Sequence, residues 1–215
     1  MKKKRAIFIT VEGLEGSGKS SVIKFLELFL QDRKFSVKVY REPGTTRIGE
    51  QIRSILLDKN NKELSVHTEL LLYLAARTQL IEEKLKKDLK KYDFVICDRF
   101  FDSTLVYQGF ALGLGKIAWD SVKLFSLGVI PDLTLLLDSS VKAGLARLKS
   151  KDRIESRPLN FHNKLKKGYL KLAKKYPRRI KIIDARGNLD TIYRNVKAVL
   201  EKNIFLQKKF SGKRQ

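Results

Sequence analysis

A glycine-rich loop near the start of the chain constrains its fold more than any other feature. The loop fits the pattern G-x-x-x-x-G-K-[ST] and reads Gly13-Leu14-Glu15-Gly16-Ser17-Gly18-Lys19-Ser20. An apolar run over residues 6–11 precedes it, and apolar residues recur at helical spacing after Lys19. This order of strand, loop and helix is the context that the pattern requires, whereas a chance match would be a tight turn before a core helix. We therefore expect an α/β protein.

The residue types of the loop suit the binding of a phosphate anion. Glycines let the backbone curl so that successive N–H groups face the anion, and the following helix adds its positive N-terminal end. Lys19 would reach the β- and γ-phosphates of a nucleoside triphosphate, and the Ser20 hydroxyl would ligate Mg²⁺. Phosphate binding is accordingly assigned to Gly13, Leu14, Glu15, Gly16, Ser17, Gly18, Lys19, Ser20 and Ser21.

Five short apolar segments alternate with segments of helical periodicity, and they span residues 6–11, 37–40, 94–98, 133–138 and 180–184. Such alternation predicts a doubly wound, mainly parallel five-stranded sheet flanked by helices. Ligands of these sheets bind beyond the carboxyl ends of the strands, where Arg41, Asp98 and Arg99 fall. We expect one domain over residues 1–205 of the 215 and a loose, basic tail over 206–215.

The chain is strongly basic, with 46 Lys and Arg against 23 Asp and Glu and a formal net charge of +23. Clustered cations are typical of nucleic-acid binding. Here the lysines follow helical stretches such as residues 83–87 and 164–167, which lack interleaved aromatic residues. We interpret most of the charge as solvated helix faces that also steer anionic nucleotides, and we do not expect nucleic-acid binding to be the function.

The N-terminus and the single cysteine indicate a cytoplasmic protein. The basic start is similar to that of a signal peptide, but Glu12 interrupts the apolar run too soon, and no later segment is long enough to span a bilayer. Cys97 lies in an apolar run and is expected to be a small core residue. We therefore predict no membrane association.

Further motifs resemble one family of kinases. They are Glu12-Gly13-Leu14-Glu15-Gly16, Arg41-Glu42-Pro43-Gly44-Thr45, Ala75-Ala76-Arg77, Asp98-Arg99-Phe100, residues 103–109, Pro131-Asp132-Leu133-Thr134 and Asp152-Arg153-Ile154-Glu155. Over nearly the whole chain they follow the order found in thymidylate kinases, which are nucleoside monophosphate kinases. The resemblance implies a P-loop kinase fold, a homodimer, and Mg²⁺-dependent transfer of the ATP γ-phosphoryl group to dTMP, a step in dTTP biosynthesis.

The same resemblance implies which residues bind dTMP: Glu15, Arg41, Pro43, Tyr73, Arg77, Arg99, Thr104, Tyr107 and Gln108. Glu15 would take the sugar 3′-hydroxyl, Tyr73 would stack on thymine, and Arg99 would hold the acceptor phosphate. Thr104 and Gln108 would read the thymine edge, and the Tyr107 ring would crowd a ribose 2′-hydroxyl. Tyr73 and Arg77 are four residues apart, so one helix face can direct both into one pocket. The alternatives are an exposed loop residue for Glu15, helix core for Tyr73 and a surface group for Arg99.

Two neighbouring features of the acceptor side are also expected. The bond between Glu42 and Pro43 is a candidate for a cis peptide. Arg53 either reaches the dTMP phosphate or faces solvent.

Phosphoryl transfer needs two anions in line and positive charge over the transition state. We assign this charge to Lys19, Arg99 and one lid cation, for which Arg153 and Arg147 are the candidates. Ser20 and Asp98 would hold Mg²⁺, and a helix cap is the alternative role for Asp98. Residues 147–157 resemble a short mobile lid of the bacterial, lid-arginine subtype. The loop Ala185-Arg186-Gly187 resembles one that packs against adenine, and a plain strand-to-helix turn is the alternative.

Two rival functions are compatible with parts of the sequence. A deoxynucleoside kinase would phosphorylate a free hydroxyl and need an activating carboxylate, for which Glu42 is the candidate. A nucleotide-regulated nucleic-acid-binding module would use the charge of +23. The full order of the motifs favours neither.

Overall fold

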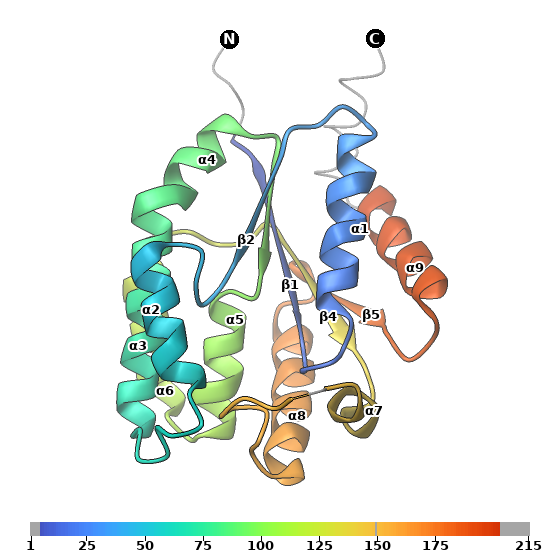
Figure 1. The fold of residues 1–215 in the computed structure, drawn as a ribbon. Helices are drawn as coiled ribbons and strands as arrows, with labels where there is room; N and C mark the ends of the chain where they lie inside the picture. Colours follow the sequence, from blue (N-terminus) through green and yellow to red (C-terminus); the bar gives the residue numbers. More distant parts are fainter. Residues whose placement is uncertain (1–4, 149, 203–215) are drawn as a thin grey trace.

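Five parallel strands form the centre of the protein in a computed structural model that describes residues 5–148 and 150–202 (Figure 1). The strands are β1 (Ile7–Gly13), β2 (Val37–Arg41), β3 (Phe94–Asp98), β4 (Leu133–Asp138) and β5 (Ile180–Asp184), and their order in the sheet is β2-β3-β1-β4-β5. Every pairing is parallel. The predicted doubly wound fold is confirmed, and each predicted segment forms one strand.

The connections between the strands form helices. They are α1 (Lys19–Gln31), α2 (Arg47–Leu57), α3 (Val66–Leu80), α4 (Lys86–Lys91), α5 (Phe101–Thr104), α6 (Gly115–Phe125), α7 (Val141–Ala146), α8 (Leu159–Lys175) and α9 (Leu189–Lys202). Two π-helical segments, η1 (Ile81–Leu85) and η2 (Leu105–Ala111), continue α3 and α5. The segments α3, η1 and α4 follow one another without a break, so they form one long helix with a π-helical turn inside it. None of the helices in the described part of the chain is long and apolar enough to cross a membrane.

The sheet has a hydrophobic cluster on each face. The helices α1 and α9 cover one face, and α3, α6 and α8 cover the other (Figure 1). In β3, Phe94 and Ile96 pack into the cluster under α1 and α9. Val95 and Cys97 pack into the cluster on the other face, because successive side chains of a strand point to opposite faces. Burial on both faces explains why this strand is apolar throughout, and Cys97 is a core residue as predicted.

The parallel register brings the carboxyl ends of the strands to one edge of the sheet, the lower edge in Figure 1. Val11 of β1 and Arg41 of β2 both align with Asp98 of β3, so the residues that follow these strands are close together. The glycine-rich loop leaves β1 at this edge and enters α1 at Lys19. The candidate site therefore lies where ligands of doubly wound sheets bind.

Candidate active site

The phosphate loop, residues 13–21, is shaped by its backbone. Gly16 and Gly18 have φ of 66° and 93°, in the left-handed region that glycine adopts without strain. The Lys19 ammonium folds back over the loop and donates to the carbonyl oxygens of Gly13 at 3.2 Å and Leu14 at 2.8 Å. Burial, together with the charge of Arg99, lowers the pKa of Lys19 to about 8. A helix N-terminus and a lysine beside it make this loop suited to a polyphosphate.

Glycine also brings the phosphate loop against α7. A Cβ on Gly16 would lie 2.1 Å from the Gly144 carbonyl oxygen, and a Cβ on Gly144 would lie 2.5 Å from the Glu15 carbonyl oxygen. Directly after α7, Arg147 donates from Nη1 to the Gly16 carbonyl at 3.0 Å. The first residue of the predicted lid therefore contacts the phosphate loop.

Ser20 and Asp98, the predicted metal ligands, line one open cavity. Asp98 Oδ1 is buried and accepts no hydrogen bond from the described residues. A cation, directly or through water, would satisfy such an oxygen. The described residues contain no group of three or more His, Cys, Asp or Glu that could hold a metal, so Mg²⁺ at this place would take most of its ligands from phosphates and water. Ser20 and Asp98 fit that kind of site.

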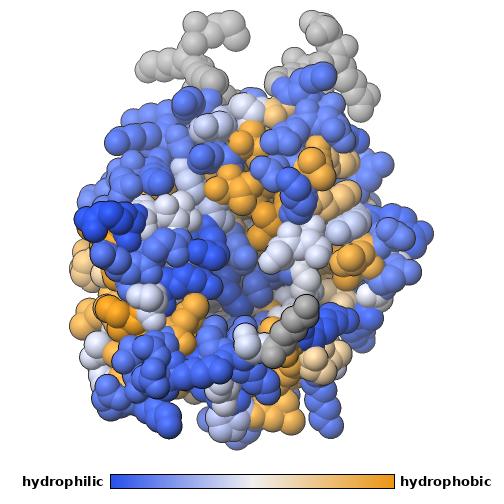
Figure 2. All heavy atoms as spheres, viewed as in Figure 1, coloured by the Kyte–Doolittle hydropathy of each residue, from blue (hydrophilic) through white to orange (hydrophobic). Residues whose placement is uncertain are grey.

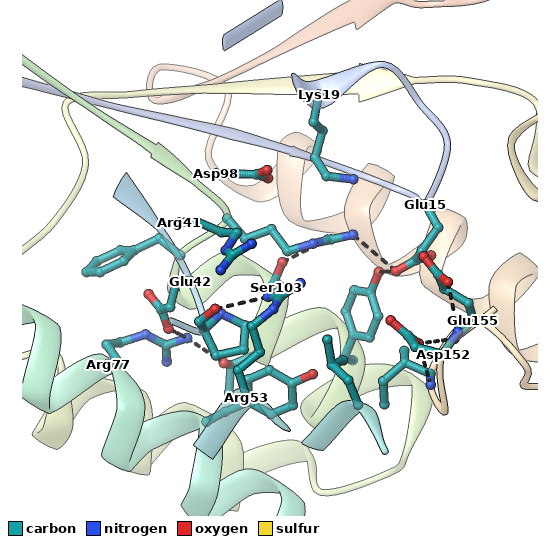
Figure 3. Close-up of a pocket in the computed structure, with 18 of the residues that line it drawn as sticks. Glu15, Lys19, Arg41, Glu42, Arg53, Arg77, Asp98, Ser103, Asp152 and Glu155 are labelled. Carbon is teal, nitrogen blue, oxygen red and sulfur yellow. Dashed lines mark hydrogen bonds and ion pairs between the residues drawn. The ribbon is translucent and has the colours of Figure 1, made fainter. Parts of the chain in front are cut away.

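A second cavity of about 200 Å³ lies beside Lys19, Glu15 and Asp98 (Figure 3). It is lined by every residue predicted to bind the acceptor: Glu15, Arg41, Pro43, Tyr73, Arg77, Arg99, Thr104, Tyr107 and Gln108. Hydrophilic side chains surround the hollow at the centre of the face in Figure 2. Segments far apart in the sequence therefore meet where one small ligand can touch all of them.

Arg99 is the centre of the hydrogen-bond network in this cavity. Its Nη2 donates to Glu15 Oε1 at 3.1 Å, and its Nη1 donates to Ser103 Oγ and Tyr169 OH, each at 3.1 Å. Its backbone has φ of 68°, a conformation that is costly for a residue with a side chain and that occurs preferentially at functional sites. Tyr107 OH also donates to Glu15 Oε1. The network fixes the direction of the Arg99 guanidinium.

The carboxylate of Glu15 is buried in this network rather than pointing to solvent. Burial alone would raise its pKa, but the His162 imidazole at 3.5 Å and the charges of Arg99 and Lys19 lower the pKa below its usual range. Glu15 is therefore ionised and available as a hydrogen-bond acceptor for a ligand hydroxyl.

Glu12 accepts hydrogen bonds from residues that surround Arg99. Its fully buried carboxylate accepts hydrogen bonds from Phe100 N at 2.8 Å, Ser103 Oγ at 2.7 Å and Tyr169 OH at 2.9 Å. Burial, with Asp102 nearby, raises the pKa of Glu12 to about 7. Sequence reasoning gave Glu12 no role and missed Tyr169 and His162 of α8. These last two are seven residues apart and share a helix face, which the sequence pattern does not distinguish from core.

Arg77 and Glu42 form a fully buried ion pair at the far end of the cavity. Arg77 Nη2 also donates to Thr104 Oγ1 at 2.8 Å, while Nε and Nη1 are buried and have no acceptor among the described residues. Buried donors of this kind are satisfied when a ligand supplies a carbonyl oxygen. The predicted cis peptide between Glu42 and Pro43 is present. Tyr73 lines the cavity with Arg77, as their shared helix face predicts.

A family profile described as thymidylate kinase matches residues 11–196. The chain belongs to the thymidylate kinase family. A thymidylate kinase of Clostridium novyi is 41% identical over 203 residues, which cover 92% of this chain and 99% of the relative. One of Geobacillus thermodenitrificans is 43% identical over 192 residues, covering 86% and 85%. The crystal structure of thymidylate kinase from Ehrlichia chaffeensis has a TM-score of 0.76 at 28% identity and covers 92% of this chain and 100% of that one.

These similarities confirm the predicted family and the P-loop kinase fold, and with them the prediction that the protein is a phosphotransferase. Neither rival function receives support from them. Glu42, the candidate base of a deoxynucleoside kinase, is paired with Arg77.

The remaining predicted residues occupy several different surroundings. Arg41 lines the cavity and forms an ion pair with Glu50 at 2.9 Å. Arg53, which the sequence left open, also lines the cavity and donates to the Pro43 carbonyl at 3.0 Å. Burial and the charge of Arg41 lower the pKa of Arg53. An anionic ligand in the cavity would meet both cations.

Arg153, a candidate for the catalytic lid cation, is bound to α3 and α2. Its Nη2 contacts Glu69 Oε2 at 2.7 Å, and its Nε donates to the Leu56 carbonyl at 2.8 Å. Of the two lid arginines that are candidates for the catalytic cation, Arg147 is the one that contacts the loop. The predicted adenine loop follows β5, where Ala185 is buried, Arg186 pairs with Asp184 at 2.8 Å, and Gly187 precedes α9.

Proposed function

We propose that the protein transfers the γ-phosphoryl group of ATP to dTMP and forms dTDP and ADP. The observation that carries this proposal is the convergence of all nine predicted acceptor residues on one cavity that Lys19 of the phosphate loop also lines. A chain with only a phosphate loop would bind a triphosphate, whereas this cavity provides a place for the acceptor within reach of the same lysine. In-line placement of the two anions is the main requirement of phosphoryl transfer.

On the donor side, we propose that Lys19 and the loop N–H groups bind the β- and γ-phosphates. Mg²⁺, held by Ser20 and Asp98, would neutralise charge on these oxygens. Arg147 lies on the Gly16 carbonyl and is the lid cation that we expect to turn toward the donor phosphates, as in the lid-arginine subtype. Arg153 would instead anchor the lid through Glu69.

On the acceptor side, Arg99 would hold the dTMP phosphate, since a guanidinium makes forked contacts to phosphate oxygens. Glu15, ionised and adjacent, would accept the sugar 3′-hydroxyl. The free donors of Arg77 would bind a thymine carbonyl, and Tyr73 would stack on the ring. Arg53 and Arg41 add positive charge where the acceptor phosphate enters. Ala185, Arg186 and Gly187 would pack against the donor adenine.

We further propose a homodimer formed through α3 and α6. Leu71 of α3 is 60% exposed and Leu124 of α6 is 66% exposed, and a hydrogen bond joins the two helices from Thr78 Oγ1 to the Phe125 carbonyl. Large apolar side chains on neighbouring helices favour a partner subunit. Sedimentation analysis of the protein and of Leu124→Glu tests this, because the substitution would yield monomers. The cytoplasmic location stays a prediction.

The first experiment measures ADP formation from ATP and Mg²⁺ with four acceptors at matched concentration: dTMP, dUMP, the ribose form of TMP, and thymidine. We expect dTMP to be the best substrate and dUMP a poorer one, because a methyl group in an apolar pocket contributes only about 1–3 kcal/mol of discrimination. Thymidine should be inert. Phosphorylation of thymidine, or turnover that no acceptor stimulates, would overturn the proposal.

A further inference from the structure

A buried carboxylate outside the cavity connects the lid to the acceptor site. Glu69 of α3 has no exposed surface, and it does not line the cavity. Its Oε2 accepts from Arg153 Nη2 at 2.7 Å and Arg157 Nη2 at 2.6 Å, both of which belong to the predicted lid segment. Its Oε1 accepts from Gln108 Nε2 at 2.8 Å. Two guanidinium groups therefore donate to one oxygen of this buried carboxylate, and the Gln108 amide donates to the other.

This arrangement fixes the orientation of the Gln108 amide. The Glu69 carboxylate is the acceptor in all three of its side-chain hydrogen bonds, so the Gln108 atom that faces it is the amide nitrogen. Gln108 is itself 1% exposed and lines the cavity. The polar atom that its side chain has left for a ligand is Oε1, which only accepts. Without Glu69, either end of the amide would suit the cavity.

An acceptor at this place selects among pyrimidine bases. Thymine and uracil carry an N–H donor at N3, whereas cytosine carries an acceptor at N3 and an amine in place of the neighbouring carbonyl. Arg77 reinforces the choice because its Nε and Nη1 donors are unsatisfied and need a carbonyl oxygen. A site built from fixed donors and acceptors rejects a mismatched base strongly, because its buried groups would be left unpaired.

We propose that Glu69 is a positioning residue that sets base specificity: it holds the Gln108 amide with its oxygen toward the ligand, so that the cavity takes thymine and excludes cytosine. This inference rests on the proposed function, because it concerns the base of the same acceptor. It also gives Arg153 and Arg157 a role that needs no contact with phosphate. They hold the Glu69 carboxylate, and Arg153 is itself fixed to α2 by its Nε bond to the Leu56 carbonyl at 2.8 Å.

Glu69→Gln tests the inference, because an amide at this position can donate or accept and releases the Gln108 amide to rotate. We measure kcat and KM for dTMP and dCMP with saturating ATP, and thermal unfolding in parallel. The ratio of kcat/KM for dTMP over dCMP should fall about tenfold or more, mainly through a higher KM for dTMP, while the KM for ATP stays within about twofold.

A second variant keeps Glu69 and its arginines in place. Gln108→Leu removes the reading group itself and should lower the same ratio, and Glu69→Gln in that background should cause no further loss of selectivity. An unchanged ratio in Gln108→Leu overturns the inference even if Glu69→Gln fails to fold. So does a folded Glu69→Gln protein whose ratio is unchanged, or one whose KM for ATP rises as much as that for dTMP.

The wild-type protein separates this inference from the proposed function. If it fails to phosphorylate dTMP, the proposed function itself is wrong and the inference is lost with it. If it prefers dTMP and the Glu69→Gln protein keeps that preference, only the role of Glu69 is wrong.

Discussion

The donor and acceptor sides of the site are built in different ways although they are adjacent and have one residue, Glu15, in common. The donor side is one continuous loop whose shape depends on the backbone of glycines such as Gly16 and Gly18. The acceptor side is assembled from side chains of α3, α5 and η2 and from the ends of β2 and β3 with the loops that follow them, which meet only in the folded protein. Glu15 belongs to both, since it lies in the loop and contacts Arg99. A local motif thus suffices to bind a polyphosphate, whereas selection of the acceptor requires the whole fold.

The two sides also differ in what a ligand must displace. Arg99 and Arg77 already hold their carboxylate partners, and a ligand uses the donors that are left. Lys19 and Arg147 instead donate to loop carbonyls, which are bonds that a triphosphate would replace. We therefore expect the acceptor side to be preorganised and the donor side to rearrange on binding.

Lys19→Ala should have the largest effect and should be confined to the donor side. Loss of the cation at the transferred phosphate is expected to lower kcat by about a thousandfold, while the affinity for dTMP changes only a few-fold. Steady-state kinetics and dTMP titration measure the two quantities. Lys24→Ala, which removes an exposed lysine of the same helix, serves as the control. An equal loss of dTMP affinity would mean that the two sides are not separable.

Arg99→Ala should produce the converse result. Its guanidinium is the centre of the acceptor network, so kcat/KM for dTMP should fall about a hundredfold. The affinity for a fluorescent ATP analogue should stay within about threefold. Arg194→Ala, on the exposed side of α9, should change neither quantity. If both ligands bind equally poorly, Arg99 supports the fold of the site and does not hold the acceptor.

Glu12→Gln should have the smallest effect and should appear in stability. The pKa of Glu12 is about 7 in the folded protein against 4.5 for the free group, so the folded state retains a proton that the unfolded state loses. This contribution is full below pH 4.5 and is lost as the pH rises through 7. Between pH 5 and pH 8 the Tm of the wild type should therefore fall by about 5–10 °C relative to the variant. Glu63→Gln, at an exposed position, should show no such difference, and parallel curves for Glu12→Gln would contradict the assignment.

The sequence predicts the donor side and the strands well because these signals are local. Apolar runs locate all five strands, and the glycine pattern locates the phosphate loop. The nine acceptor residues were identified by resemblance to a family, since no spacing in the sequence brings Tyr73 and Arg99 together. Glu69 lies in α3 and its side-chain partners lie in η2 and the lid, so its role depends on tertiary contacts. One of these contacts also binds Arg153, a candidate for the catalytic lid cation, to Glu69 of α3.

Because Gly16 and Gly144 approach each other closely, a substitution at either position is limited by the backbone of the other segment. A methyl group at either would meet backbone atoms of the other segment or of its neighbour Glu15, and a rotamer change cannot move backbone atoms aside. Gly16 also has φ of 66°, so both its backbone conformation and the lack of space favour glycine there. Over generations, α7 cannot gain a side chain at Gly144 without separating the phosphate loop from this helix.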